Sequence, residues 1–481
     1  MPVIHAAADP SIMKMAIGTS AGIMMSQASA FSAIDEQKFK AFHWRAIVTT
    51  GLGVFCDGYD LSAIGIVLPL VLASFGIAKI GSIESGLLAG SALVGAAVGA
   101  LIFGLLGQNG RKRFYGLDVL LMGIMAVAQA FAPNLEWLIA IRFVLGIGIG
   151  ADYVLSPTIM AEHANRADRG RTLGIGFGVM WPLGAFTAAI LNLILAGFGF
   201  SHDLQWRIVL AAGAVPAFSV LYLRRRMPET ARYLARLAAD PGAAVEVMRT
   251  ISGRTVTAPI EDARPFGVVF TQHARLIFSA ALLWLVFDIV IYSSILFGPS
   301  LIAKGLGMGP IEFALLTQAI FVIPSCVFYA LYVLDKVGRK PLQVWGFIGA
   351  AVMLAIFAIM KPSLVALPVL GFIVFGLYNV AINGASAVSG AGILGVELSP
   401  TRIRTVGQSI TVVGGRIGAS ISAFLFPVLF TRLGEVGVII LLAVLSVLGA
   451  ILTQTLVPET ARVSLEALNG DDIIHAATAG D

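Results

Sequence analysis

The sequence is poor in charge and in cysteine for a chain of its length. Of its 481 residues only 12% are charged and 58% are hydrophobic, whereas a soluble domain carries about 25% charged residues. So much apolar surface does not fit inside one globule, so a bilayer is the expected solvent for most of it. The two cysteines, Cys56 and Cys326, lie in apolar runs and indicate neither a disulfide framework nor a metal site.

Features of an enzyme or of a nucleic-acid-binding protein are also scarce. No nucleophile–base constellation or cluster of metal ligands is recognisable, so we expect no enzyme, no metal and no cofactor. Lys+Arg exceed Asp+Glu by 32 − 27 = +5, which in so apolar a chain is interpreted as charge on cytoplasmic loops rather than as a surface for nucleic acid.

Apolar stretches of the length that a membrane-spanning helix needs, about 20 residues, recur along the whole chain, whose mean hydropathy is +0.91. They predict an all-α membrane protein of twelve helices with both termini on one side. The predicted spans are 45–75, 84–107, 114–132, 137–162, 171–198, 206–224, 274–303, 311–334, 341–359, 364–396, 405–432 and 436–456.

Basic residues concentrate in alternate loops, which predicts that these loops and both termini face the cytoplasm. Residues 1–42 are interpreted as a cytoplasmic tail. Because the sequence shows this full bias and no targeting segment, we expect a prokaryotic inner (plasma) membrane. The basic loops hold Arg111, Lys112 and Arg113, then Arg166, Arg169 and Arg171, then Arg224, Arg225 and Arg226, then Lys336, Arg339 and Lys340, and finally Arg402 and Arg404.

The two halves of the chain repeat one another. Gly110-Arg111-Lys112 recurs 228 residues later as Gly338-Arg339-Lys340, and a PETAR segment at 228–232 recurs at 458–462. The copies fall on the same membrane side, which is typical of transporters whose two halves rock about a midplane site. The predicted parts are bundles of six helices at 43–226 and 273–457, a cytoplasmic loop at 227–272 and a cytoplasmic tail at 458–481.

Charged residues within the spans are candidate functional residues, because a charge in the bilayer centre costs at least about 2.5–3.5 kcal/mol. Asp57 and Asp60 are three residues apart in the first span and share a helix face. Two carboxylates so close in an apolar setting resist joint ionisation, which suits a group that takes up and releases a proton. The alternative is a helix-breaking loop that reaches water.

The fourth span carries Arg142 and Asp152, together with glycines at 146, 148 and 150. A dinucleotide-binding fingerprint would need a preceding strand, so the glycines are interpreted as sites of close helix packing. Arg142 and Asp152 lie about 15 Å apart along a helix. They therefore need separate partners or a wet cavity.

The second half carries a polar stripe. Trp284, Asp288 and Tyr292 recur every four residues in the seventh span and so share a face, which should point into the bundle, although Trp and Tyr also anchor helices at interfaces. Asn379 and Asn383 are likewise four apart. Arg416, between two glycines in the eleventh span, would either hold an anionic substrate or neutralise an acid.

The loop 104–112 and its second copy resemble the signature of the major facilitator superfamily, and the resemblance covers nearly the whole chain. The first copy has Gln108 where an acid is usual, so the resemblance implies that the gating ion pair persists only in the second copy. The residues assigned to this gating motif are Gly104, Gly110, Arg111, Lys112, Asp335, Gly338, Arg339 and Lys340.

Within the superfamily the chain is most similar to phosphate:proton symporters, through Asp57-Gly-Tyr-Asp60, Gly150-Ala-Asp152-Tyr153 and the stripe of the seventh span. The resemblance implies that Asp57, Asp60 and Asp152 handle protons, and we assign Arg142 to the same set. The family has a fifth-helix glutamine that contacts phosphate, whereas residues 179–182 of this chain read Val-Met-Trp-Pro and hold no amide. The resemblance implies that Tyr153, Trp284, Asp288 and Tyr292 surround the substrate, and the predicted substrate site also includes Trp181, Asn379, Asn383 and Arg416.

The resulting hypothesis is a proton-coupled symporter of a small anion, phosphate first, that acts as a monomer in the lipid bilayer with no nucleic-acid partner. A carrier of a sugar or of a small organic or aromatic acid is the alternative, since the Asp-Gly-Tyr-Asp motif also occurs in such carriers and two indoles could stack on a ring. A membrane sensor that binds solute without moving it is the alternative from another class.

Overall fold

The computed structural model describes residues 31–77, 83–254, 261–297, 303 and 306–471, and these residues form helices and no strand. Most of the predicted tail at 1–42 lies outside the described residues. The first six predicted spans fall on the following helices. They are α3 (Ala41–Ser74), α4 (Ile83–Leu106), α6 (Leu117–Gln129), α7 (Leu135–His163), the run of α8 (Arg169–Leu173), η2 (Gly174–Val179) and α9 (Met180–Gly197), and the pair α10 (His202–Ala212) and α11 (Ala214–Arg225).

The last six spans are built in the same way, with π-helical stretches η4, η5 and η6 inside two of them. They are α14 (Phe266–Phe297), the run of α16 (Pro310–Thr317), η4 (Gln318–Val322), α17 (Ile323–Phe328), η5 (Tyr329–Val333) and α18 (Leu334–Val337), then α19 (Arg339–Ala366), the run of α20 (Pro368–Ala385), η6 (Ser386–Gly390) and α21 (Ile393–Glu397), and finally α22 (Arg404–Leu456).

The twelve predicted spans are recovered with local differences. Eleven helices among the described residues are long and apolar enough to cross a membrane. The third span is shorter than predicted, because Gly116, at φ 115°, separates α5 (Arg111–Phe114) from the 13-residue α6. The eleventh and twelfth spans run together in α22 but bend at Gly434, where φ is 69° and ψ is 171°.

The seventh helix begins at Phe266, eight residues before its predicted start at 274. The residues just before the predicted start include Thr271, Gln272 and His273, which lower the local hydropathy. Because hydropathy marks only the part of a helix that lies in lipid, a helix that continues into water is predicted too short.

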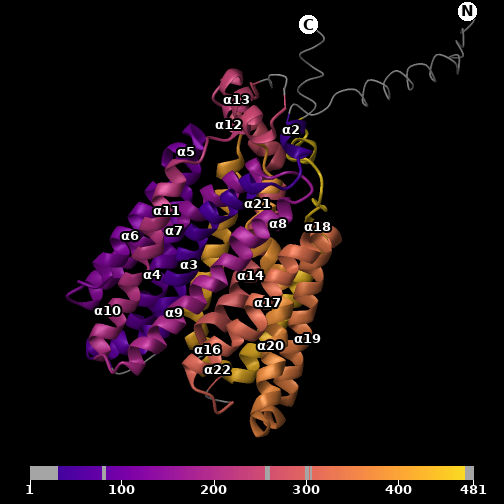
Figure 1. Ribbon diagram of the computed structural model, residues 1–481. Coiled ribbons are helices and arrows are strands. Elements are labelled where there is room, and N and C mark those ends of the chain that lie inside the picture. The colour runs from indigo at the N-terminus through magenta and orange to yellow at the C-terminus, as the bar shows by residue number, and fades with distance from the viewer. Residues whose placement is uncertain (1–30, 78–82, 255–260, 298–302, 304–305, 472–481) are drawn as a thin grey trace, which may run out of the picture.

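The two sets of helices form two bundles that lie side by side (Figure 1). The indigo to magenta bundle holds α3 to α11, and the orange to yellow bundle holds α14 to α22. Beyond one end of the bundles lie α2 (Ser32–Asp35), α12 (Ala231–Arg236) and α13 (Pro241–Ser252). We call this end, where Arg111, Arg169, Arg339 and Arg404 lie, the basic end.

The glycines of α7 are packing residues, as the sequence predicted. A Cβ on Gly146 would lie 2.2 Å from the carbonyl oxygen of Ala92, and one on Gly150 would lie 2.0 Å from that of Ala96, both on α4. Such distances are far below van der Waals contact, so only glycine lets the two helix backbones approach this closely.

The internal repeat is visible in three dimensions at the basic end. Glu229 accepts a hydrogen bond from the backbone of Lys112 at 2.9 Å, and Glu459 accepts one from Lys340 at 3.0 Å. In each half the following threonine, Thr230 or Thr460, donates to a buried glutamate of the same half. The PETAR segments are therefore equivalent anchors for the two motif loops.

Those two glutamates, Glu162 and Glu397, also bind arginines of the opposite bundle. Arg404 contacts Glu162 at 2.8 Å, and Arg169 contacts Glu397 at 2.7 Å. All four side chains are buried. These two ion pairs hold the bundles together at the basic end, so the structure is a state closed at this end.

The predicted asymmetry of the gating motif is present in the structure. Asp335 pairs with Arg339 at 2.8 Å and accepts hydrogen bonds from the backbones of Gly170 and Arg171 in the other bundle, at 2.9 and 2.6 Å. In the first copy, Gln108 instead donates to the hydroxyl of Thr405 at 2.7 Å. The first motif thus crosses the bundles through Gln108 and through Arg111, which donates to the carbonyl of Thr401 at 3.0 Å, and not through an acid at the Gln108 position.

Arg232 joins both ends of the described chain to α12. It contacts Asp35 of α2 at 2.8 Å and Glu466 at 2.7 Å. Burial raises the pKa of Asp35 to about 6 despite the charge of Arg232. Burial also raises the pKa of Glu466, but the charge and hydrogen bonds of Arg232 together with the charge of Arg404 outweigh it, so the net direction is downward. Glu466 is therefore the firmly ionised partner, and Asp35 is the one that takes a proton first.

Candidate functional site

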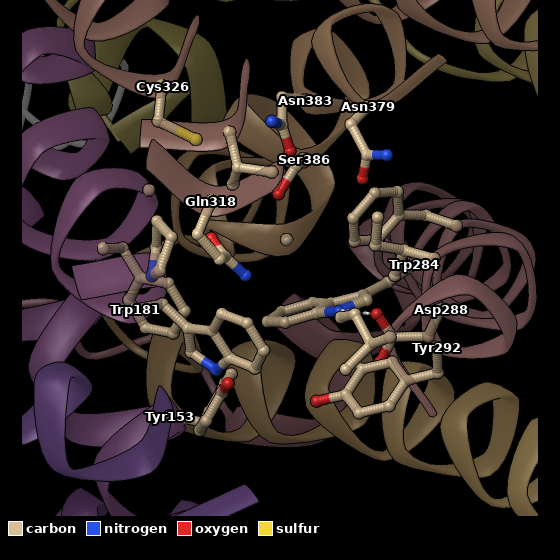
Figure 2. A pocket seen from close by; sticks show the side chains of 18 of the residues that line it. Tyr153, Trp181, Trp284, Asp288, Tyr292, Gln318, Cys326, Asn379, Asn383 and Ser386 are labelled. Atoms are coloured by element: carbon tan, nitrogen blue, oxygen red, sulfur yellow. Dashed lines mark hydrogen bonds between the residues drawn. The ribbon is translucent and has the colours of Figure 1, made fainter. Parts of the chain in front are cut away.

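A cavity of about 80 Å³ lies between the two bundles. A buried water needs roughly 10–15 Å³ by this measure, so the cavity has room for a few waters or one small solute. Figure 2 shows its wall, with two indoles and several polar side chains around an open centre. All the residues predicted for the substrate site line it, namely Tyr153, Trp181, Trp284, Asp288, Tyr292, Asn379, Asn383 and Arg416.

The cavity wall is unevenly divided between the bundles. Only Tyr153 on α7 and Trp181 on α9 come from the first bundle among the predicted residues. The others come from α14, α20 and α22. The charged part of the wall therefore belongs to the second bundle.

Arg416 is the centre of a buried polar network. It donates to Asp288 and to the hydroxyl of Tyr292, both at 3.0 Å, while Trp284 donates to Asp288 at 3.2 Å. Its guanidinium also lies 4.5 Å from the ring centre of Tyr153, across the boundary between the bundles. Two roles were predicted for Arg416, neutralising an acid or holding an anionic substrate. In the structure it pairs with the acid Asp288, and it also borders the cavity.

The stripe of the seventh span faces the bundle interior, as predicted, and not a membrane interface. Trp284 is 2% exposed and Tyr292 is 4% exposed. A Cβ on Gly415 would lie 2.5 Å from the indole of Trp284. The glycine before Arg416 therefore makes the room that Trp284 occupies.

Three polar or polarisable residues of the wall escaped the sequence analysis: Gln318, Cys326 and Ser386. Gln318 stands at the start of η4, and Ser386 at the start of η6, so each begins a π-helical stretch. Such stretches are frequent at functional sites. A polar residue inside an apolar span was the available signal for Gln318.

The acids assigned to protons do not line the cavity. Asp57 and Asp60 on α3 are buried, and neither carboxyl has a hydrogen-bond partner among the described residues. Asp152 accepts hydrogen bonds from Ser156 and interacts electrostatically with Asp57, whereas Asp60 lies beside Gly213. The acids form a separate polar region inside the first bundle.

Arg224 corrects a prediction. The sequence assigned it to a cytoplasmic loop with Arg225 and Arg226, yet it is fully buried at the last turn of α11. It contacts Asp118 at 2.5 Å and Asp152 at 2.7 Å. A run of three arginines is typical of a loop, so only the packing of α11 on α6 and α3 distinguishes the first of them.

Arg142 is buried without a salt bridge to any described carboxylate. Its guanidinium donates to Gln129 at 3.0 Å and to the carbonyl of Leu88 at 3.2 Å. Asp60 is the acid that interacts with it electrostatically. Arg142 and Asp152 thus have separate partners, as their spacing predicted.

Comparison with known proteins agrees with this architecture. The family model described as "Sugar (and other) transporter" matches residues 46–471. A probable inorganic phosphate transporter 1-6 of Arabidopsis thaliana is 30% identical over 92% of this chain and 97% of its own. A probable inorganic phosphate transporter 1-10 of Oryza sativa is 32% identical over 93% of each chain.

Solved structures show the same fold. The proton:xylose symporter XylE of the major facilitator superfamily, bound to 6-bromo-6-deoxy-D-glucose, superposes with a TM-score of 0.74 at 21% identity, over 89% of this chain and 99% of that one. The inward-open conformation of XylE from E. coli superposes with a TM-score of 0.65 at 22% identity, over 89% of this chain and 99% of that one. This chain is an integral membrane protein that has the fold of XylE and belongs to the sugar (and other) transporter family, with inorganic phosphate transporters among its relatives.

Proposed function

We propose that this protein is a secondary transporter that carries inorganic phosphate together with protons by alternating access. The observation that carries the proposal is the cavity between the bundles, where Arg416 borders the space for a small solute and is bonded to Asp288 and Tyr292. The plant relatives align with more than nine-tenths of this chain and are named as probable inorganic phosphate transporters, which supports the same substrate.

The substrate part of the proposal rests on the chemistry of the wall. Phosphate presents several oxygens that accept hydrogen bonds, and Tyr153, Tyr292, Trp181 and Arg416 all carry N–H or O–H donors that border the cavity. Guanidinium and phosphate form strong, charge-assisted hydrogen bonds. Asp288 partly neutralises Arg416, which makes the arriving anion exchangeable rather than permanently held.

The proton part rests on the buried acids of the first bundle. Asp57, Asp60 and Asp152 are removed from water, and ionised carboxylates in such a place need a counterion or a proton. Asp152 and Tyr153 are neighbours on α7, one in the acid region and the other in the cavity wall. We infer that protonation of this region and occupancy of the cavity together permit the bundles to rock.

The carrier has no chemical step in this proposal, and it works as a monomer with both termini at the cytoplasmic face. The relatives are plant proteins, which favours a eukaryotic membrane over the prokaryotic inner membrane that the sequence suggested. We therefore retain only the plasma membrane as the proposed location.

Two other functions remain as outcomes of the test. Trp181 and Trp284 flank the cavity (Figure 2), which would suit a ring-shaped sugar or an aromatic acid. A non-transporting sensor would use the same cavity. The first predicts competition by unlabelled sugars or aromatic acids, and the second predicts binding without flux.

The test is uptake of radiolabelled phosphate into tight proteoliposomes of known orientation, with and without an inward proton gradient. We expect concentrative uptake that a protonophore abolishes, and loss of that accumulation in Asp57→Asn and in Asp152→Asn, with phosphate exchange retained. No uptake by the wild-type protein would refute phosphate transport. Wild-type accumulation in either variant would refute the assignment of that acid.

A further inference from the structure

The donors of the cavity wall are not equally available to a ligand. Arg416 and Trp284 already donate to Asp288, and Asn383 donates to Ser325 at 3.0 Å. Asn379 donates to the carbonyl of Phe375 at 2.9 Å. A ligand therefore needs donors beyond these, or must compete with the bonds that they already make.

Gln318 is a wall residue whose amide makes no hydrogen bond with the described part of the chain. Its carbonyl oxygen, Oε1, is buried and has no hydrogen-bond partner among the described residues. Figure 2 shows its amide nitrogen pointing into the open centre of the cavity, between Trp181 and Trp284. A buried amide that is unpaired at one end and aimed into a cavity at the other is typically completed by a ligand or by water.

The position of Gln318 in its helix is also unusual. It is the first residue of the π-helical stretch η4, within a span whose neighbouring residues are apolar. A π-helical turn changes the direction in which the following side chains point relative to a regular helix. The eighth span thus departs from regular helix where its amide enters the wall.

We propose that Gln318 is a substrate-binding residue that determines selectivity among oxyanions. When the amide turns so that both of its ends face the cavity, its N–H donates to one oxygen of the anion and its oxygen accepts a hydrogen bond from a protonated oxygen of the same anion. Phosphate carries both kinds of oxygen at neutral pH, whereas sulfate carries acceptors only. The inference rests on the phosphate transport proposed above.

The consequence is a preference for phosphate and arsenate over sulfate. A buried polar group that a ligand leaves unpaired penalises that ligand, so sulfate leaves the acceptor of Gln318 without a donor. The loss of one hydrogen bond to a charged ligand weakens binding by roughly 10- to 100-fold. Sulfate gains the N–H donor of the amide but leaves its oxygen unpaired, so the amide contributes little net affinity for sulfate. Removal of the amide should therefore weaken the binding of phosphate much more than that of sulfate.

The test compares Gln318→Met, which keeps the length of the side chain but removes donor and acceptor, with Thr317→Val. Thr317 is the preceding residue, is buried, and also has an unpaired side-chain oxygen, but it does not line the cavity. The assay measures KM for phosphate and inhibition constants for arsenate and sulfate in proteoliposomes.

We expect Gln318→Met to raise KM for phosphate and the inhibition constant of arsenate by roughly 10- to 100-fold. The constant for sulfate should change by less than about threefold, and kcat and the dependence on the proton gradient should persist. Thr317→Val should behave like the wild type. An unchanged KM in Gln318→Met, or equal weakening of phosphate and sulfate, would overturn the proposal.

A second variant covers the case in which Gln318→Met does not fold. Gln318→Glu keeps the shape of the amide and introduces a negative charge beside the anion, so it should also raise KM for phosphate. An unchanged KM in this variant would again overturn the proposal. Wild-type protein that does not take up phosphate at all would instead refute the proposed function, so the two failures are distinguishable.

Discussion

Replacement of Arg224 by leucine separates the proposed coupling region from the rest of the fold. Arg224 is the counterion of two buried carboxylates, Asp118 at 2.5 Å and Asp152 at 2.7 Å. Asp118 keeps two backbone N–H donors, from Gly116 at 2.7 Å and from Val119 at 2.8 Å. Asp152 keeps only the hydroxyl of Ser156. Asp152 is therefore the acid expected to bind a proton when the arginine is removed.

The loss of stability expected for Arg224→Leu has an upper limit. Breaking a buried ion pair by removing one partner costs about 3–5 kcal/mol. Protonating a carboxyl at pH 7 costs about 4 kcal/mol, from an ordinary pKa of about 3.9 and 1.36 kcal/mol per pH unit. We therefore expect Arg224→Leu to lower stability by about 3–4 kcal/mol and to lower Tm in detergent by roughly 5 °C.

The functional expectation is more specific than the loss of stability. An Asp152 that stays protonated cannot take up and release a proton in each cycle. Arg224→Leu should therefore exchange labelled for unlabelled phosphate while losing accumulation driven by a proton gradient. The matched control is Arg225→Leu, since Arg225 is the next residue and is exposed. It should match the wild type in both assays.

A double variant decides whether the effect runs through the acid. Replacing both partners of a buried pair is often nearly neutral, so adding Asp152→Asn to Arg224→Leu should recover the part of the lost Tm that is due to Asp152, while Asp118 still lacks its arginine. The reasoning is refuted if Arg224→Leu is as stable and as concentrative as Arg225→Leu. It is equally refuted if the double variant is no more stable than Arg224→Leu.

Two further predictions concern the basic end. Glu397→Gln removes the charge that binds Arg169 and should open the basic end. A thiol reagent applied at that end should then modify Cys326 in the cavity wall several-fold faster than in the wild type. An unchanged rate of modification would contradict the idea that these ion pairs close the basic end. Burial raises the folded pKa of Asp35 from 3.8 to about 6, so docking of α2 is strongest below about pH 4 and weakens until about pH 6. Trypsin should therefore cleave after the exposed Lys38 about tenfold faster at pH 7.5 than at pH 5, once the rates are corrected for the activity of the protease itself. Asp35→Asn should remove this pH dependence. If Asp35→Asn kept the same pH dependence, another titrating group would be responsible.

The fold was largely predictable because hydropathy is a local property. Each apolar run was found, and the motif repeat indicated two equivalent bundles. The misses occurred where a helix leaves the lipid or bends. The seventh helix begins at Phe266, ahead of the polar residues Gln272 and His273, Gly116 divides the third span, and Gly434 bends α22. Such features depend on where water begins and on single backbone angles, which hydropathy does not record.

The cavity was predictable for a related reason. A polar side chain in an apolar span must face the protein interior, and this argument alone brings Trp284, Asp288 and Arg416 together. It should also have included Gln318. It fails for Arg224, because the end of a span and the start of a basic loop have the same composition. Which arginine turns inward depends on partners more than 70 residues away in sequence.

The two bundles are alike at the basic end and unlike in the membrane, and this contrast bears on mechanism. The motif loops and glutamates are duplicated, so they serve a step that both bundles perform, the closure of one end. The acid region lies in the first bundle, and most of the cavity wall lies in the second. The neighbours Asp152 and Tyr153 link the two, since one contacts Arg224 and the other stacks on Arg416. In the proposed mechanism, a proton taken up at Asp152 would act on the cavity through a single turn of α7, because Tyr153 is the next residue of that helix.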